Sequence, residues 1–175
     1  MNKPISRTRR TLFLAATILG LAAGQTQAAD LGCRLLPGSY LTTITDIEGV
    51  FASRGVVTFI PGGVLIVADS RQGGQTGVYD PFSVGQGAWI CAENQEGEIA
   101  FHAISITFTT PPGNAGSQIG HVDYAGVVDA TSGEIEGKLS LRLSDTQDLE
   151  GQDPISNPGD VLEEFDFSGK RIRLP

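Results

Sequence analysis

Hydrophobic and polar residues alternate in short runs along most of the chain, and turn residues separate one run from the next. From residue 40 onward no helical periodicity is sustained, and the period of two is typical of β-strands with one buried face. The breaks are rich in Gly, Pro, Asn and Asp, as in Pro111-Pro112-Gly113-Asn114, and favour tight turns. The pattern predicts eight strands, most of them paired as antiparallel hairpins, over residues 40–47, 50–60, 63–70, 87–92, 98–109, 118–129, 134–144 and 161–173.

This series of strands predicts an all-β fold, a single eight-stranded antiparallel up-and-down barrel, with a β-sandwich as the alternative. Closure into a barrel removes the two exposed edges that an open sheet would leave. Leu139, Leu141 and Leu143 alternate with polar residues, as do Phe165 and Phe167, so we expect these side chains to face one apolar interior. Eight strands enclose only packed side chains or one small ligand. Two longer connections, residues 71–86 and 145–160, would hold a lid, a rim or a helical turn.

The start of the chain has the features of an export signal. Basic residues precede an apolar stretch over residues 12–23, which is too short to span a bilayer, and small residues precede an expected cleavage after Ala28. We therefore interpret residues 1–28 as a signal peptide and residues 29–175 as the barrel domain. The pair Arg9-Arg10 also fits a twin-arginine signal, so both export routes stay open. We expect a periplasmic or secreted protein without stable membrane insertion.

Charge narrows the range of partners. The chain carries 12 basic and 20 acidic residues, a formal charge of −8. Residues 1–28 hold four basic and no acidic residues, so the remainder keeps eight basic and 20 acidic residues, a formal charge of −12. Because phosphates are usually bound by Lys and Arg, we expect no nucleic-acid partner. The acidic stretch between Asp145 and Asp160 departs from the EF-hand spacing, so a solvated loop is the simpler interpretation than a calcium site.

Cys33 and Cys91 are the only cysteines. An even number of cysteines in an exported chain predicts a disulfide between them, and two separate buried thiols are the alternative. Two distant cysteines and two histidines show no zinc-ligand spacing, so we expect no metal site.

The layout of glycine and aromatic residues along the predicted strands resembles that of a known group. The positions that carry the resemblance are Gly38-Ser39-Tyr40, Phe59 before Gly62-Gly63, Gly87-Ala88-Trp89 and the aromatic strand that closes the chain. With its strand number, the chain resembles the broad calycin group of small β-barrels, including barrels of the allene oxide cyclase and dirigent type. The resemblance implies a barrel that binds a small apolar molecule or directs a cyclisation in its lumen. It supplies no catalytic motif and assigns no residue.

Candidate chemistry comes from strand alternation. Nucleophile-elbow, Walker and dinucleotide-binding motifs are absent from the sequence, so we expect no cofactor. His102 shares a strand face with apolar residues and Tyr124 lies on the more apolar face of the next strand, so both are inferred to point into the lumen. There they could polarise a carbonyl or move a proton. The alternatives are core residues with satisfied polar tips, or a facing assignment that is wrong by one residue.

Tyr40 and Trp89 are further candidates for ligand contact. Tyr40 would line or plug the barrel, and Trp89 would line one end or pack against the disulfide, since large aromatic residues most often supply core area. Asp69 ends an apolar strand beside a long connection, where the sequence favours ordinary strand-end polarity over an acid–base role.

These observations favour an exported barrel that binds or sequesters a small, mostly apolar molecule. One alternative is a cofactor-independent isomerase or cyclase that uses His102 and Tyr124 in the lumen. Another is a structural or interaction protein of the envelope whose function lies on the long loops. The sequence leaves open the ligand, the oligomeric state and whether the protein is an enzyme.

Overall fold

The computed structural model describes residues 32–75, 78–93, 98–110, 116–146, 153, 155–156 and 158–174. The signal peptide predicted over residues 1–28 lies outside them. Each strand begins and ends within two residues of its predicted bounds. In chain order the elements are the 3-10 helix η1 (Gly32–Leu35), β1 (Gly38–Asp46), β2 (Phe51–Ile60), β3 (Val64–Asp69), β4 (Gly85–Glu93), β5 (Ile99–Phe108), β6 (Gln118–Val128), β7 (Glu134–Asp145) and β8 (Glu163–Arg171).

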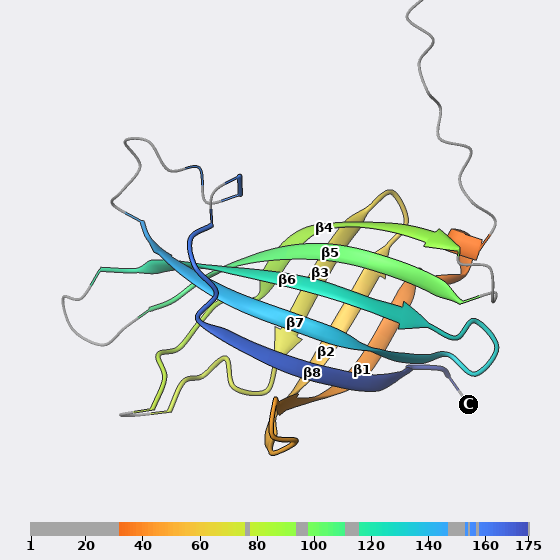
Figure 1. Cartoon of the computed structure of the whole chain (residues 1–175), viewed down its shortest axis with the longest axis horizontal. Helices are drawn as coiled ribbons and strands as arrows, with labels where there is room; N and C mark the ends of the chain where they lie inside the picture. The colour runs from red at the N-terminus through yellow and green to blue at the C-terminus, as the bar shows by residue number, and fades with distance from the viewer. Residues whose placement is uncertain are drawn as a thin grey trace, which may run out of the picture.

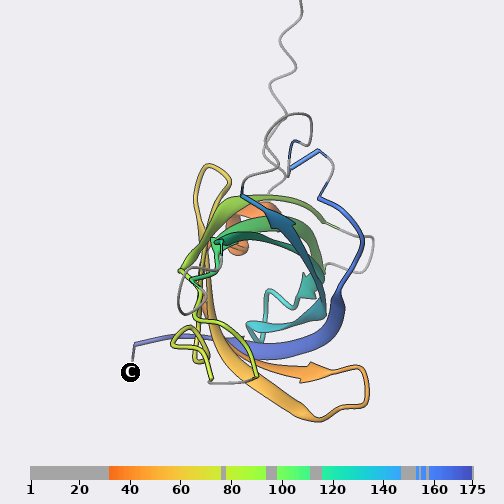
Figure 2. The same ribbon diagram turned by 90° about the vertical axis from the view of Figure 1, so that its left-hand side faces the viewer.

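The eight strands form a closed antiparallel barrel in sequence order (Figure 1). Every strand pairs with the next one, and β8 pairs with β1 so that Tyr40 lies opposite Arg171. Seen end-on, the strands make a complete ring (Figure 2). The predicted up-and-down barrel is therefore confirmed, and closure pairs the two strands that would otherwise be edges.

Buried side chains fill one end of the barrel, which we call the plugged end. The helix η1 lies at this end (Figure 1). Cys33 and Cys91 form the predicted disulfide, which ties η1 to β4. The ring of Phe59 lies at the centre of an aromatic group, with its centroid 5.0–5.9 Å from those of Tyr40, Trp89 and Phe101. The buried residues packed around this group include Leu36, Leu65, Ile99, Val128 and Ile135.

Glycines on the inner face of β6 and β7 make room for two of the large rings. A Cβ atom at Gly126 would lie 3.0 Å from Cζ of Phe101, and one at Gly137 would lie 2.9 Å from Cζ of Phe167. The two glycines are cross-strand partners, so together they leave a recess that the rings occupy. Side chains at these positions would also collide with the backbone of the neighbouring strand, since the Cβ atoms would lie 2.4 Å from the Glu136 carbonyl oxygen and 2.2 Å from that of Ala125.

The opposite end, which we call the loop end, is where the longer connections start. They join β3 to β4, β5 to β6 and β7 to β8 (Figure 1). An isolated bridge between Phe82 and Thr109 joins two of them. Among the described residues, no helix has the length and hydropathy needed to cross a membrane.

Candidate functional site

A cavity of about 630 Å³ occupies the barrel interior beyond the plug and reaches the connections at the loop end. This volume falls in the usual range for small-molecule sites, about 300–1,000 Å³. One wall is apolar and comes from β6, β7 and β8. It includes the leucines and phenylalanines that were predicted to face the interior, and that prediction is confirmed. The apolar residues of this wall are Val122, Leu139, Leu141, Leu143, Phe165 and Phe167.

The opposite wall is built from small side chains. Gly55 on β2, Gly85 on β4 and Ser105 on β5 all line the cavity. They lie at neighbouring register positions, since Gly55 pairs with Asp69, Gly85 pairs with Val67 on the same strand β3, and Ser105 pairs with Gly87, two residues after Gly85. Small residues facing Leu and Phe leave the space unfilled, so the barrel contains a cavity here instead of a packed core.

Two buried hydroxyl groups in this wall are satisfied by the protein itself. Thr42 Oγ1 donates a hydrogen bond to the carbonyl oxygen of Gly55 at 3.1 Å. Ser53 Oγ donates to Oδ2 of Asp69 at 2.7 Å, and Oδ1 of the same carboxylate accepts the backbone N–H of Arg71 at 2.7 Å. Asp69 is therefore held in a fixed orientation on the cavity wall, where sequence reasoning favoured ordinary strand-end polarity.

A phenol and a hydroxyl lie side by side in the same region. Tyr124 faces the lumen as predicted, and burial raises the pKa of its phenol to about 12, with the Ser105 hydroxyl opposing the rise and the Asp69 carboxylate adding to it. Tyr124 is thus a neutral hydrogen-bonding group at physiological pH. The Ser105 side chain is only 1% exposed, yet its Oγ makes no well-formed hydrogen bond within the described residues.

The rim of the cavity carries charged side chains. The Arg71 guanidinium lies over the ring of Tyr79, with 5.3 Å between Cζ and the ring centroid. Asp80 and Glu163 also line this part of the cavity. Among the described residues that line the cavity, Arg71 is the only cation, and Asp69, Asp80 and Glu163 supply three carboxylates.

The prediction that His102 faces the lumen is wrong. Its side chain is 50% exposed on the outer face of β5, and the inner face is formed by Phe101, Ala103 and Ser105. Both faces of this strand are largely apolar, so the alternation did not decide between them and the assignment slipped by one residue. The predicted pairing of His102 with Tyr124 in the lumen therefore does not occur. The same error in the assignment of faces meant that Ser105, a polar residue on the buried face, was not predicted to line the lumen.

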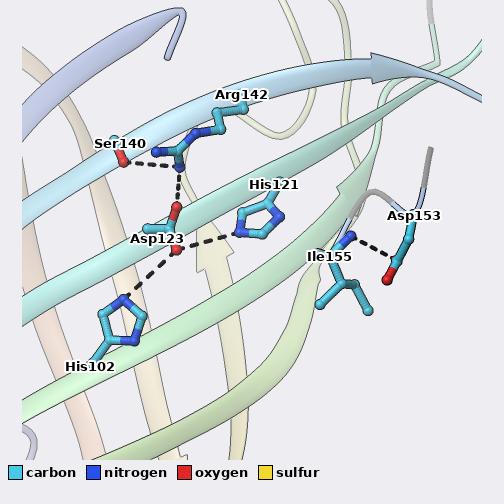
Figure 3. Close-up of polar contacts among 7 residues, drawn as sticks. All are labelled: His102, His121, Asp123, Ser140, Arg142, Asp153 and Ile155. Atoms are coloured by element: carbon cyan, nitrogen blue, oxygen red, sulfur yellow. Dashed lines mark hydrogen bonds and ion pairs between the residues drawn. The ribbon is translucent and has the colours of Figure 1, made fainter. Parts of the chain in front are cut away.

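The two histidines of the chain instead meet one carboxylate on the outer face of the barrel (Figure 3). Nε2 of His102 lies 3.8 Å and Nε2 of His121 lies 3.4 Å from Oδ1 of Asp123. The other carboxylate oxygen accepts a hydrogen bond from Arg142 Nη1. Among the described residues, no group of three or more His, Cys, Asp or Glu side chains is arranged to hold a metal ion. The cluster is separated from the cavity by the barrel wall.

Tyr40 and Trp89, the other predicted ligand contacts, belong to the plugged end. Tyr40 Oη donates to the carbonyl oxygen of Leu36 at 2.9 Å. Trp89 Nε1 donates to the carbonyl oxygens of Ile60 and Val64 at 3.1 and 3.0 Å. Neither side chain lines the cavity, and each finds its polar partners within the plug.

A second depression, of about 720 Å³, lies against the outer strand faces of β1, β7 and β8. Its lining is mainly charged and polar. It includes the ion pair between Lys170 Nζ and Glu134 Oε1, which are 3.4 Å apart. Exposed ion pairs of this kind are typical of a solvated strand face. The lumen, which combines an apolar wall with polar side chains, is therefore the candidate functional site.

No protein-family model matches the chain, and the comparisons with curated proteins and with solved structures found no significant similarity.

Proposed function

We propose that the protein is an exported binding protein that holds or sequesters one small, mostly apolar molecule in the barrel lumen. The observation that carries the proposal is the cavity of about 630 Å³, with an apolar wall on one side and polar side chains elsewhere in its lining. Apolar walls supply affinity by removing ligand surface from water, and isolated polar groups orient the ligand. A ligand would enter at the loop end, because side chains fill the other end.

The proposal includes a periplasmic or secreted location and a calycin-like type of barrel. The predicted signal peptide and the Cys33–Cys91 disulfide support the location, since disulfides persist in oxidising compartments. The up-and-down order of eight strands, one plugged end and an internal cavity support the type of barrel.

The first test is to fill the lumen. Val122→Trp places a large ring in the cavity beside Ser105, because Val122 and Ser105 are cross-strand partners on the inner face. Ala125→Trp adds the same ring to the exposed outer face of the same strand and serves as the matched control. We expect Val122→Trp to weaken binding of the neutral apolar dye Nile red by about tenfold or more, and Ala125→Trp to leave it within about twofold.

The natural ligand is sought by native mass spectrometry of protein purified from its own compartment, followed by denaturing extraction. A stoichiometric small molecule that Val122→Trp fails to retain supports the proposal. A wild-type protein that is empty and also takes up no Nile red contradicts it.

A cofactor-independent isomerase or cyclase is the second candidate, because Asp69 and Tyr124 line one largely apolar cavity. The neutral phenol would donate a hydrogen bond to a substrate carbonyl, and the carboxylate would accept and return a proton. His102 takes no part, since it lies outside the barrel. Incubation of the extracted molecule with fresh protein tests this candidate: a product of unchanged mass and altered retention time, lost in Tyr124→Phe and Asp69→Asn, supports it, and unconverted ligand contradicts it.

A further inference from the structure

We propose that the molecule held in the lumen carries a protonated amine, and that the Asp69 carboxylate binds this ammonium group beside the hydroxyls of Ser105 and Tyr124. The inference rests on the proposed lumen-binding function and narrows the chemical class of the ligand. Three observations support it: the charge of the cavity lining, the geometry of the Asp69 carboxylate, and the buried Ser105 hydroxyl that lacks a well-formed hydrogen bond.

The charge of the lining favours a cation. Three carboxylates, those of Asp69, Asp80 and Glu163, line the cavity together with the single guanidinium of Arg71. That guanidinium lies over the ring of Tyr79, and no ion pair joins it to Asp69 within the described residues. The negative charge of Asp69 therefore faces the lumen without a protein cation beside it.

The geometry of Asp69 leaves it ready to accept more hydrogen bonds. Each oxygen takes one protein donor, Ser53 Oγ at Oδ2 and the Arg71 backbone N–H at Oδ1. A carboxylate has about four acceptor positions, so each oxygen keeps one for a ligand. Because the two protein donors fix the carboxylate in advance, a bound ammonium group meets an acceptor that needs no further ordering. The apolar surroundings strengthen the attraction between the two charges.

Ser105 gives an observation that is independent of the acidic side chains. Ser105 lines the cavity, and its almost completely buried Oγ has no well-formed hydrogen bond within the described residues, its polar influence falling on the Tyr124 phenol, whose pKa it acts to lower. Buried polar atoms normally find a partner, and a ligand in the lumen would supply one. A Cβ atom at Gly85 would lie 3.0 Å from this oxygen, so the glycine keeps the space beside the hydroxyl open. The Tyr124 phenol borders the same space and offers a second neutral partner.

This arrangement discriminates against anionic ligands. A fatty acid or another carboxylate would bring a second negative charge next to Asp69 in a medium where like charges repel strongly. A neutral alcohol could donate a hydrogen bond to the carboxylate but would add no attraction between opposite charges. The expected order of affinity is amine, then alcohol, then acid.

Three indole compounds with matched rings test this order by isothermal titration calorimetry on the wild-type protein. Tryptamine carries the ammonium group, tryptophol a hydroxyl and indole-3-propionate a carboxylate. We expect tryptamine to bind about tenfold or more tightly than tryptophol, and indole-3-propionate to bind most weakly. Equal affinities, or a preference for the acid, overturn the inference. If none of the three binds while Nile red does, the amine class is wrong and lumen binding stands. If Nile red also fails to bind, the proposed function itself is wrong.

A variant pair separates local recognition from general charge. Asp69→Asn keeps the shape of the side chain, and we expect it to weaken tryptamine binding by about tenfold while tryptophol changes by less than about threefold. Asp166→Asn removes a carboxylate from the outer face of β8, where it pairs with Lys138 at 3.2 Å, and serves as the control. An equal loss in both variants would mean that net charge, and not Asp69, attracts the amine. Circular dichroism confirms that each variant keeps its β-sheet signal.

Discussion

The guanidinium of Arg171 lies over the ring of Tyr40, with 5.0 Å between Cζ and the ring centroid, and so links the last strand of the barrel to the first. The same guanidinium donates hydrogen bonds to the carbonyl oxygens of Leu35, Leu36 and Pro37 at the end of η1. The Arg171 side chain therefore connects the two strands that close the barrel, the aromatic plug and the segment that carries Cys33. A rigid plug at this end fixes the floor of the cavity.

We expect Arg171→Lys to lower the free energy of unfolding by about 2 kcal/mol, because an ammonium group cannot stack on the ring and serve three carbonyl groups at once. Urea unfolding followed by circular dichroism measures the change. Arg173→Lys, at an exposed position two residues along, is the control and should change stability by less than about 0.5 kcal/mol. A similar loss in both variants would show that the network around Tyr40 adds nothing specific.

The disulfide should contribute strongly to stability. Cys33 and Cys91 are separated by 58 residues, and loop-closure entropy for a loop of that size corresponds to about 4 kcal/mol. We expect replacement of both cysteines by serine to lower the free energy of unfolding by about 2–4 kcal/mol. Dithiothreitol should destabilise the wild type by a similar amount and leave the double variant unchanged. A wild type that is insensitive to the reductant after confirmed reduction would contradict this expectation.

The alternation of side chains predicted the fold well wherever one strand face is clearly more polar than the other. In β7, Leu139 and Leu141 alternate with Lys138 and Ser140, so both the strand and its inner face followed from the pattern. In β5, Ile104 and other apolar side chains lie on the outer face, and the pattern carried no such contrast. The pattern therefore did not show which face of β5, the strand that carries His102 and Ser105, points into the barrel.

The pattern of residues within single strands could not predict the cavity. It exists because Gly55, Gly85 and Ser105, from three different strands, line the same wall opposite Leu141. Their coincidence depends on the register of every strand pair between them, which the spacing of apolar residues within one strand does not determine. Asp69 was interpreted as strand-end polarity for the same reason, since only the register shows that the end of β3 reaches the lumen.

The corrected position of His102 leads to a simple prediction. Because its side chain lies on the outer face and is half exposed, His102→Gln should leave Nile red and tryptamine affinities within about twofold of the wild type. Tyr124→Phe removes a hydroxyl that borders the cavity, and we expect it to weaken tryptamine binding by about threefold to tenfold. Calorimetric titration measures both. A large effect of His102→Gln together with no effect of Tyr124→Phe would contradict the placement of His102 outside the barrel and of Tyr124 inside it.

The phenol of Tyr124 should make the stability of the protein depend on alkaline pH. Burial raises its pKa from the ordinary value of 10.0 to about 12, against the opposing influence of Ser105, because the phenolate would have to form at a buried position near Asp69. The folded state therefore keeps the phenolic proton over a pH range in which the unfolded chain has already lost it. The contribution is fully present below about pH 10 and is lost as the pH rises to about 12, at about 1.4 kcal/mol per pH unit.

Tyr124→Phe removes this contribution and isolates it from other groups that titrate in the same range, including Tyr40, whose phenol pKa is also raised by burial. Urea unfolding of both proteins at a series of pH values gives the difference in stability between them. We expect this difference to shift against the wild type by about 2 kcal/mol between pH 10 and pH 12. A difference that stays constant across that range would mean that the Tyr124 phenol ionises as readily in the barrel as in water, and that the cavity around it is open to solvent.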